Sequence, residues 1–332
     1  MNNVASPIPA KDGAKPASNK KSAVMAYISK YRIFVVFLAI FVLLSLLSPA
    51  FLKTRNLMNV VRQISIIGII SMSMTMVIIS GGIDLAAGSI VALVSVLSAL
   101  VGQAGVHPLV LTILVGCGVG AMCGFIMGFL IAKTRIPPFI ATLGMLTTAR
   151  GVALLISRGE PIGNLSAGYE FIGGGYLLGV PVPIIIFVVI VAFSGFILAK
   201  TKLGKYIYGV GGNENAARIC GVNVDFYKIV IYTIEGLFCA IAAIILTGRI
   251  SAGSGTAGGS YELDAIAASV IGGTSMSGGV GQVGGTVVGV LIIGVLNNGL
   301  DLLKVSPYWQ QILKGIIIVG AVIMDMRKSK ER

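Results

Sequence analysis

The chain has 332 residues, of which 56% are hydrophobic and only 11% are charged. Soluble domains carry about 25% charged residues, so a single soluble domain is excluded. The net charge of +13 does not indicate nucleic-acid binding, because the Lys and Arg residues gather at the ends of long apolar runs. The composition predicts an all-α integral membrane protein in contact with lipid.

A polar tail precedes the apolar runs. Residues 1–31 are rich in Pro, Ala, Ser and Lys, which predicts a disordered segment. The apolar runs cover residues 32–48, 60–80, 86–104, 108–132, 138–157, 182–199, 226–247, 264–276, 282–299 and 308–325. A membrane helix needs about 20 mostly apolar residues, so we expect about ten transmembrane helices, with the short run 264–276 as a half-helix or re-entrant segment.

Basic residues set the expected orientation of these helices. They concentrate in the N-terminal tail, at Lys133 and Arg135, within residues 200–228 and in the C-terminal tail 327–332. The positive-inside rule places such residues in the cytoplasm. We therefore expect both tails to be cytoplasmic and residues 32–326 to form one membrane domain.

Two similar acidic segments interrupt the apolar sequence. Residues 81–89 and 261–269 share an Asp, an Ala pair and a Ser in nearly the same order. The shared polar residues are Asp84 and Ser89 in the first segment and Asp264 and Ser269 in the second. Carboxylates and glycines between membrane helices mark helix breaks, where transporters place their pathways. Each Asp has a second interpretation, as the cap of the helix that follows it.

The order of these signals predicts an internal duplication. With the expected orientation, Asp84 lies at the end of an inward-running helix, whereas Asp264 follows an outward-running one. The Pro-containing segments 135–139 and 305–309 repeat with the same inversion. Spans two to five and seven to ten would then be inverted repeats, as in alternating-access transporters. Chance similarity between Gly- and Ala-rich segments is the alternative.

Glycine is abundant, with 45 residues, and part of it is periodic. Two series repeat every four residues, namely Gly116, Gly120, Gly124 and Gly128, and Gly281, Gly285 and Gly289. On a helix this spacing produces a smooth stripe that lets two backbones approach closely. The stripes predict tightly packed membrane helices.

Arg150, Glu235 and Lys314 fall well inside the predicted spans, away from their ends. A charge at the bilayer centre costs about 2.5–3.5 kcal/mol on insertion scales, so Arg150 and Glu235 need a partner or contact with water. They either line or gate a pathway or belong to a packing network between helices, and they could pair with each other. Lys314 is expected to snorkel to the membrane surface.

No motif for catalysis is present, and the match to a dinucleotide fingerprint at residues 279–284 follows a membrane segment and not the strand of a βαβ unit. The four cysteines form no CxxC pair and no histidine lies near them, which predicts no metal, cofactor or enzymatic centre. The phosphate-binding pattern GxxxxGK[ST] is absent. Energy for transport would have to come from a partner's ATP or from an ion gradient.

The longest predicted cytoplasmic connection covers residues 200–228. Within it, Asn213 can cap a short helix, Glu214 suits the first turn and Gly221 can end it. A short helix of this kind is suited to docking a soluble partner. An ordinary solvated loop is the alternative.

At this connection the sequence resembles a known family. Residues 214–221 read Glu-x-Ala-Ala-x-x-x-Gly and resemble the EAA-type cytoplasmic loop of ATP-binding-cassette (ABC) import permeases. Four further segments look like those of the ribose/xylose/galactose-type sugar permeases, at residues 81–85, 137–144, 261–268 and 307–311. The likeness covers residues 30–328, and the stretch 261–290 looks most like the galactose/methyl-galactoside branch.

The resemblance implies a permease domain over residues 32–326 in the bacterial inner (plasma) membrane, with 200–228 as the ATPase-coupling loop. It also implies a second permease copy in a dimer, a cytoplasmic ABC ATPase subunit and an extracytoplasmic sugar-binding protein. The expected ATPase-coupling residues are Gly212, Glu214, Ala216, Ala217, Arg218 and Gly221. The expected residues of the translocation pathway or gate are Asp84, Ser89, Arg150, Glu235, Asp264 and Ser269.

The predicted function is that of a monosaccharide permease in a binding-protein-dependent importer. One alternative is an ion-coupled secondary transporter of a small polar solute, which would work without an ATPase partner. A second alternative is an ABC permease for another solute, such as a branched-chain amino acid.

Overall fold

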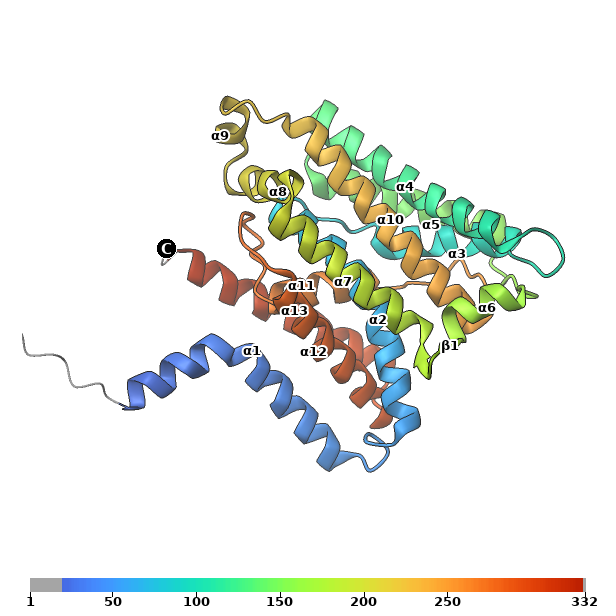
Figure 1. Cartoon of the computed structure of the whole chain (residues 1–332), viewed down its shortest axis with the longest axis horizontal. Coiled ribbons are helices and arrows are strands. Elements are labelled where there is room, and N and C mark those ends of the chain that lie inside the picture. Colours follow the sequence, from blue (N-terminus) through green and yellow to red (C-terminus); the bar gives the residue numbers. More distant parts are fainter. Residues whose placement is uncertain (1–19, 331–332) are drawn as a thin grey trace, which may run out of the picture.

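The computed structural model describes residues 20–330, and these residues form a bundle of helices with one small hairpin (Figure 1). The long helices are α1 (Lys20–Leu47), α2 (Thr54–Ile79), α4 (Leu109–Thr134), α5 (Pro138–Ser157), α7 (Val182–Lys200), α10 (Val224–Ile250), α12 (Val283–Leu302) and α13 (Pro307–Lys330). The shorter helices are α3 (Ala87–Val101), α6 (Ala167–Gly174), α8 (Lys202–Gly212), α9 (Glu214–Ile219) and α11 (Tyr261–Ile271). Strands β1 (Tyr176–Leu177) and β2 (Val180–Pro181) pair antiparallel.

The all-α membrane class is confirmed. Among the described residues, six helices are long and apolar enough to cross a membrane, namely α2, α4, α5, α7, α10 and α12. Two shorter apolar helices accompany them, α3 and the part of α1 from residue 33 to 47. Every predicted apolar run falls on a helix, and the run 138–157 coincides with α5.

In the parts of the two predicted tails that the structure describes, the chain is helical. Residues 1–19 of the expected disordered tail, and residues 331–332 of the basic C-terminal tail, lie outside the described residues. Residues 20–31 form the start of α1, and residues 327–330 form the end of α13. Extending an existing helix is far easier than starting one, so polar residues beside an apolar helix continue it.

Helix α2 occupies the centre of the bundle. It contacts α7, α10, α11 and α12, and every residue from Ile64 to Ile79 is buried. Such a helix is apolar on all sides, as expected for one surrounded by other helices. The end of the molecule that carries α8 and α9 is called the α9 end below, and the opposite end, with α6 and the hairpin, the α6 end (Figure 1).

Helices α3 and α11 are too short to cross a bilayer. Their 15 and 11 residues rise about 22 and 16 Å, against a hydrocarbon core of about 30 Å. Each follows a non-helical segment, residues 80–86 before α3 and residues 251–260 before α11. We call these the first and the second break. The predicted helix breaks are therefore present.

The two short helices run in opposite directions and begin at the same depth. A Cβ at Gly88, near the start of α3, would meet the carbonyl of Gly258 and the side chain of Glu262, near the start of α11. Beyond α11, the Gly279 N–H donates to the carbonyl of Ile79 at the end of α2 (2.8 Å). Both breaks thus reach into the bundle interior from opposite ends.

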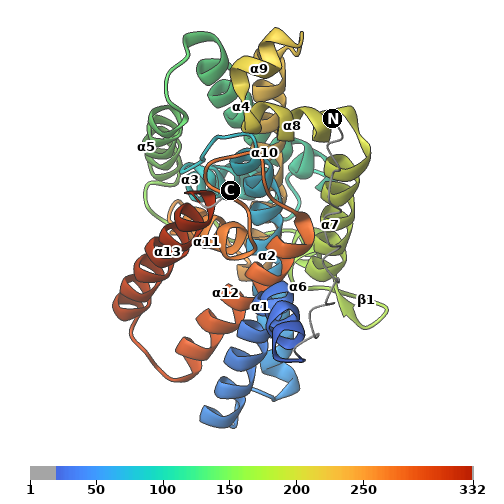
Figure 2. The same ribbon diagram turned by 90° about the vertical axis from the view of Figure 1, so that its left-hand side faces the viewer.

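The packing of the helices follows the expected inverted repeat. Helix α10 packs against α3 and α4, and α2 packs against α11 and α12. Helix α5 packs against α3, as α13 packs against α11. Both α5 and α13 begin at a Pro, and Figure 2 shows them on the same side of the molecule. The first long helix of each half, α2 or α10, therefore contacts the short helix of the other half.

The glycines of the α4 stripe, and Gly285 and Gly289 of α12, form close helix contacts as predicted, whereas Gly281 lies before α12 begins. Added Cβ atoms at Gly120 and Gly124 of α4 would meet the carbonyls of Gly236 and Tyr232 of α10. At Gly285 and Gly289 of α12 they would meet the backbone carbonyls of residues 272 and 268, at the end of α11. In lipid, the hydrophobic effect does not drive helices together. The dense backbone packing that small residues allow stabilises the contact instead.

Replacing Gly120 by Ala tests this contact. The new methyl group would overlap the Gly236 carbonyl, so α4 and α10 would have to separate. Overpacking of this kind costs about 1–3 kcal/mol, so we expect a lower Tm in detergent. Gly118→Ala is the matched control, because a Cβ at Gly118 on the same helix meets nothing within 4 Å. Equal melting temperatures of the two variants would contradict the packing account.

Candidate functional site

The short helix α9 is built as the sequence predicts. Asn213 is extended (φ −162°), and its side-chain oxygen accepts a hydrogen bond from the Ala216 N–H at 2.9 Å. Gly221 adopts φ +81°, a conformation that favours glycine, and its N–H donates to the Arg218 carbonyl at 3.0 Å. The cap and the stop confine α9 to residues Glu214–Ile219.

Two ion pairs attach α9 to the start of α10, and a third lies within α9. Glu214 accepts from Lys228 at 2.7 Å and from Arg218 at 3.1 Å. Arg218 also contacts Asp225 at 2.6 Å. An isolated exposed ion pair contributes little, but here one Arg and one Glu are each shared between two partners. The network therefore fixes α9 against α10.

The network holds its groups in the charged state. Partial burial acts to raise the pKa of Glu214, but the hydrogen bonds and charges of Lys228 and Arg218 outweigh it and lower that pKa below its usual value. The hydrogen bonds from Arg218 to Asp225 and Glu214 raise the pKa of the guanidinium. The contribution of Glu214 to stability is therefore present at neutral pH and is lost as the pH falls through its lowered pKa.

The expected ATPase-coupling residues differ in their exposure. Gly212, Ala216 and Gly221 are exposed, and Glu214 and Arg218 are half-buried in the ion-pair network. Ala217 is buried and packs with Val210, Val222 and Val224, so it holds α9 to the bundle.

The exposed surface of α9 includes one residue that the sequence reasoning did not single out. Ile219 is 87% exposed at the end of α9, beside the charged network. A large apolar side chain this exposed outside the apolar helices is suited to contact with another protein. Only the folded position of α9 distinguishes Ile219 from the many other apolar residues of the chain.

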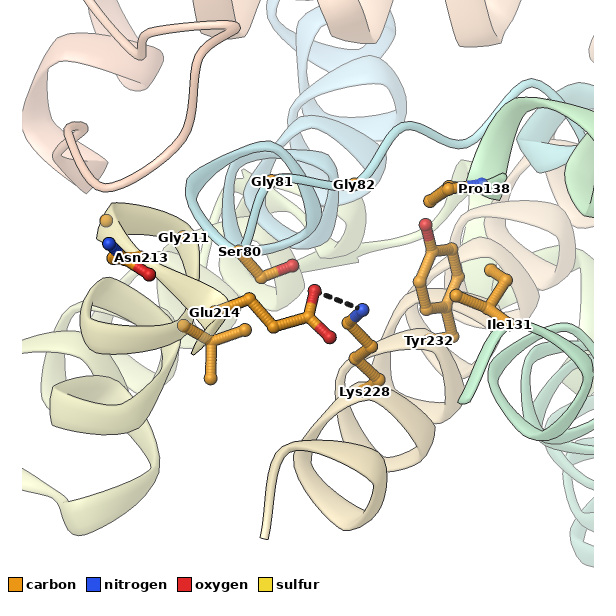
Figure 3. A pocket seen from close by; sticks show the side chains of 12 residues that line it. Ser80, Gly81, Gly82, Ile131, Pro138, Gly211, Asn213, Glu214, Lys228 and Tyr232 are labelled. Atoms are coloured by element: carbon orange, nitrogen blue, oxygen red, sulfur yellow. Dashed lines mark hydrogen bonds and ion pairs between the residues drawn. The ribbon is translucent and has the colours of Figure 1, made fainter. Parts of the chain in front are cut away.

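A cavity of about 270 Å³ separates α9 from the first break (Figure 3). Its lining comes from five helices and the first break, at Ser80, Gly81, Gly82, Ile131, Pro138, Val210, Gly211, Gly212, Asn213, Glu214, Lys228 and Tyr232. Figure 3 shows the Glu214–Lys228 pair on one side and Tyr232 on the other. The Tyr232 hydroxyl donates to the Ile83 carbonyl in the first break at 3.1 Å. One helix, α10, therefore contacts both α9 and the first break.

The first break places two buried carboxyl groups side by side. Asp84 and Glu235 are both fully buried, and their carboxyl groups lie within hydrogen-bonding range of each other. Asp84 also accepts from the Ala86 N–H at 2.6 Å, just before α3 begins. The capping interpretation of Asp84 is wrong, because the N-cap of α3 is Ala86 and no side chain caps that helix; the Asp84 carboxylate instead closes a local turn in the first break.

Arg150 holds the second break from α5. Its Nη1 donates to the carbonyls of Gly255 and Ala257, each at 2.9 Å. The pairing of Arg150 with Glu235 that the sequence allowed is wrong. Arg150 reaches backbone carbonyls of the second break, whereas Glu235 faces the first break.

Asp264 has a cationic partner. Its carboxylate contacts Lys314 Nζ of α13 at 2.9 and 3.0 Å and accepts from the amide of Asn297 on α12 at 3.3 Å. The expectation that Lys314 snorkels to the membrane surface is therefore wrong. Leaving the Asp264 carboxylate buried without a counter-charge would cost more free energy than moving the Lys314 ammonium away from the membrane surface. Lys314 therefore points into the bundle. Asp264 lies within α11, so it does not cap that helix from outside.

The two predicted serines are buried between helices. Ser89 is 2% exposed, near the start of α3. Ser269 contacts Thr75 Oγ1 at 3.0 Å, and Thr75 in turn contacts Thr286 Oγ1 at 2.7 Å. These hydroxyls join α2, α11 and α12 near the middle of the bundle, where side-chain hydrogen bonds add to helix packing.

Removing Lys314 tests the Asp264 pair. In Lys314→Met the buried carboxyl loses its counter-charge, which costs about 3–5 kcal/mol when a buried pair is broken, so we expect a much lower Tm in detergent. The double variant Lys314→Met/Asp264→Asn removes both charges and should recover most of the loss. Lys202→Met, at an exposed lysine, is the control. A double variant as unstable as Lys314→Met would contradict the pairing.

Comparison with known proteins agrees with this architecture. Residues 56–322 match the family of branched-chain amino acid transport system permease components. The chain is 49% identical to the ribose import permease of Bacillus subtilis (strain 168), over 88% of this chain and 92% of that protein. No solved structure matches the chain.

Two permeases of Escherichia coli (strain K12) represent the two sugar branches. The chain is 40% identical to the ribose import permease and 38% identical to the galactose/methyl galactoside import permease, each over 94% of this chain and 98% of the relative. The two identities are nearly equal, so the chain is similar to both branches, including the galactose branch that residues 261–290 suggested. The relatives to which the chain is similar over most of its length include these ribose and galactose/methyl galactoside import permeases. The chain belongs to the branched-chain amino acid transport system permease family.

Proposed function

We propose that this chain is the membrane-spanning permease subunit of an ABC importer that moves a monosaccharide delivered by an extracytoplasmic binding protein. The observation that carries the proposal is the position of α10, which holds α9 by ion pairs at Lys228 and Asp225 and contacts the first break through Tyr232 and Glu235. A motion imposed on α9 would therefore reach the interior of the bundle through one rigid helix. The full-length similarity to ribose and galactose permeases supports a sugar as the solute.

The α9 end faces the bacterial cytoplasm in this proposal. The basic residues at 133–135 and 200–205 lie at this end, in agreement with the positive-inside rule. A cytoplasmic ATPase dimer would bind Gly212, Ala216, Ile219 and Gly221 on the exposed surface of α9. ATP hydrolysis would occur on that separate subunit, and the permease itself would be no enzyme and would need no cofactor.

The α6 end receives the binding protein in this proposal. The β1–β2 hairpin exposes three large apolar residues, Tyr176, Leu177 and Leu178, of which Leu178 is 98% exposed. Helix α6 lies beside the hairpin, and Ile162 and Leu165 form bridges with Gly253 and Gln103 at the same end, so the connection 158–182 forms much of this face. Such a surface is suited to a transient protein partner.

A second permease copy would pack against α5. This helix exposes a stripe of small and polar residues, Gly144, Thr147, Thr148 and Gly151, where lipid contact would favour large apolar side chains. Cβ atoms at Gly144 and Gly151 would meet nothing within 4 Å, so the stripe is open to a neighbouring helix. The solute would pass beside α5, where Arg150 holds the second break, and the residues of the two breaks would act as the gate.

Alternating access follows from the arrangement of the breaks. The first break opens toward the α9 end and the second toward the α6 end, and α3 and α11 begin where the two meet. When the ATPase closes, α9 and α10 would move together and shift the first break relative to the second. Asp84, Ser89, Asp264 and Ser269 lie on the elements that would have to rearrange.

The coupling role is tested by exchanging charges. Glu214→Lys places like charges beside Lys228 and Arg218, so we expect sugar uptake to fall roughly tenfold, from a lost coupling energy of about 1–2 kcal/mol. The assay is ATP-driven uptake in proteoliposomes with the partner ATPase and binding protein.

The double variant Glu214→Lys/Lys228→Glu restores one ion pair and should recover part of the uptake. Asp301→Lys, at an exposed carboxylate near the end of α12, is the control. Uptake that stays normal in Glu214→Lys would end the coupling proposal. Transport by the permease alone, without ATPase, would favour the ion-coupled alternative, and uptake of leucine but not ribose would favour an amino-acid permease.

The orientation is tested at Cys220. This thiol is exposed next to α9, whereas Cys123 and Cys239 are buried, and Cys117→Ala removes the half-buried fourth thiol. A membrane-impermeant maleimide should label Cys220 in inside-out vesicles and leave it unlabelled in intact spheroplasts. Labelling from the outer side would place α9 outside the cell and contradict the proposal.

A further inference from the structure

Asp84 and Glu235 form a buried pair of acidic groups with no cation. Each uses one oxygen in an ordinary hydrogen bond: Asp84 Oδ1 accepts from the Ala86 N–H, and Glu235 Oε1 accepts from the Cys239 thiol at 3.0 Å. The other two oxygens, Asp84 Oδ2 and Glu235 Oε2, are buried and receive no hydrogen bond from any donor in the structure. Both groups are fully shielded from solvent.

The surroundings of the pair supply no positive charge. The titratable groups that interact with it are Tyr232 and Cys239 on α10, Cys123 on α4 and Glu262 at the start of α11. All four are neutral or acidic types. In the part of the chain that the structure describes, no Lys, Arg or His forms an ion pair with Asp84 or Glu235. Asp264 differs, because Lys314 neutralises it.

We propose that Asp84 and Glu235 form a protonation site that holds a single proton between their carboxyl groups. Two ionised carboxylates can only accept hydrogen bonds, so they cannot bond to each other, and two like charges in a buried site repel strongly. One proton converts the contact into a hydrogen bond between an acid and a carboxylate, with the remaining charge shared by the pair. The proton would join the first break to α10.

The shared proton is a property of the folded chain by itself and does not depend on transport. The pair binds one proton at neutral pH in the folded state, where two solvated carboxyl groups would bind almost none. Folding then takes up a proton, so stability falls as the pH rises, by up to about tenfold in the folding equilibrium constant per pH unit. At a pH high enough to remove the proton from the folded pair, the stability no longer decreases through this site.

Infrared spectroscopy of the purified permease detects the proton directly. The wild type at neutral pH should show a carboxylic acid C=O stretching band that shifts in D₂O, and Glu235→Gln and Asp84→Asn should each lose it. Glu160→Gln, at an exposed carboxylate, should keep it. A band that persists in both pair variants, or that is absent from the wild type, would overturn the proposal.

Thermal unfolding provides the second test. Between pH 5 and pH 8 the Tm of the wild type should fall more steeply than that of Glu235→Gln, because the amide donates to Asp84 without a titrating proton. Equal slopes would overturn the proposal. A wild-type Tm that rises when a sodium or other metal salt replaces a choline salt would also overturn it, because the pair would then hold a metal cation.

Discussion

The two breaks leave backbone N–H and C=O groups inside an apolar bundle, and a membrane interior offers them no water. Each of these groups therefore needs a partner from another element. Arg150 donates to two carbonyls of the second break, and the Ser95 hydroxyl accepts from the Ser254 N–H at 3.2 Å. In the first break, Tyr232 donates to the Ile83 carbonyl. These contacts fix the position of both half-helices, and the inverted repeat depends on them.

Helix α10 links the breaks to the rest of the molecule. Its first turns hold α9 through Asp225 and Lys228, its middle contacts the first break, and its small residues let α4 approach closely. The repeat is symmetric in its packing but not in its charges. Asp264 is neutralised by Lys314 within its own half, whereas Asp84 meets an acid that α10 brings from the other half. A displacement of α10 therefore acts on the first break through side-chain contacts and on the second break through the chain itself, which continues from Ile250 into that break.

The sequence predicts features that depend on spacing within one helix, such as the Asn213 cap and the period-four glycines, because one segment contains all the information. The breaks were also predictable from two similar acidic segments between apolar runs. The partners of Arg150, Glu235 and Lys314 were not, because they depend on which helices become neighbours. The same holds for Ile219, whose exposure follows from the fold and not from its type. Whether the pathway lies at the breaks stays a prediction.

The central claim is that α9 and α10 move as one body when the ATPase closes. Spin labels at Asn215 on α9 and Ile250 at the far end of α10 report this directly, since both positions are exposed. With labelled copies diluted in unlabelled ones, the account predicts the same 215–250 distance with and without ATP, while the distance from 215 to Val319 on α13 changes. A 215–250 distance that changes with nucleotide, with the 215–319 distance constant, would contradict it.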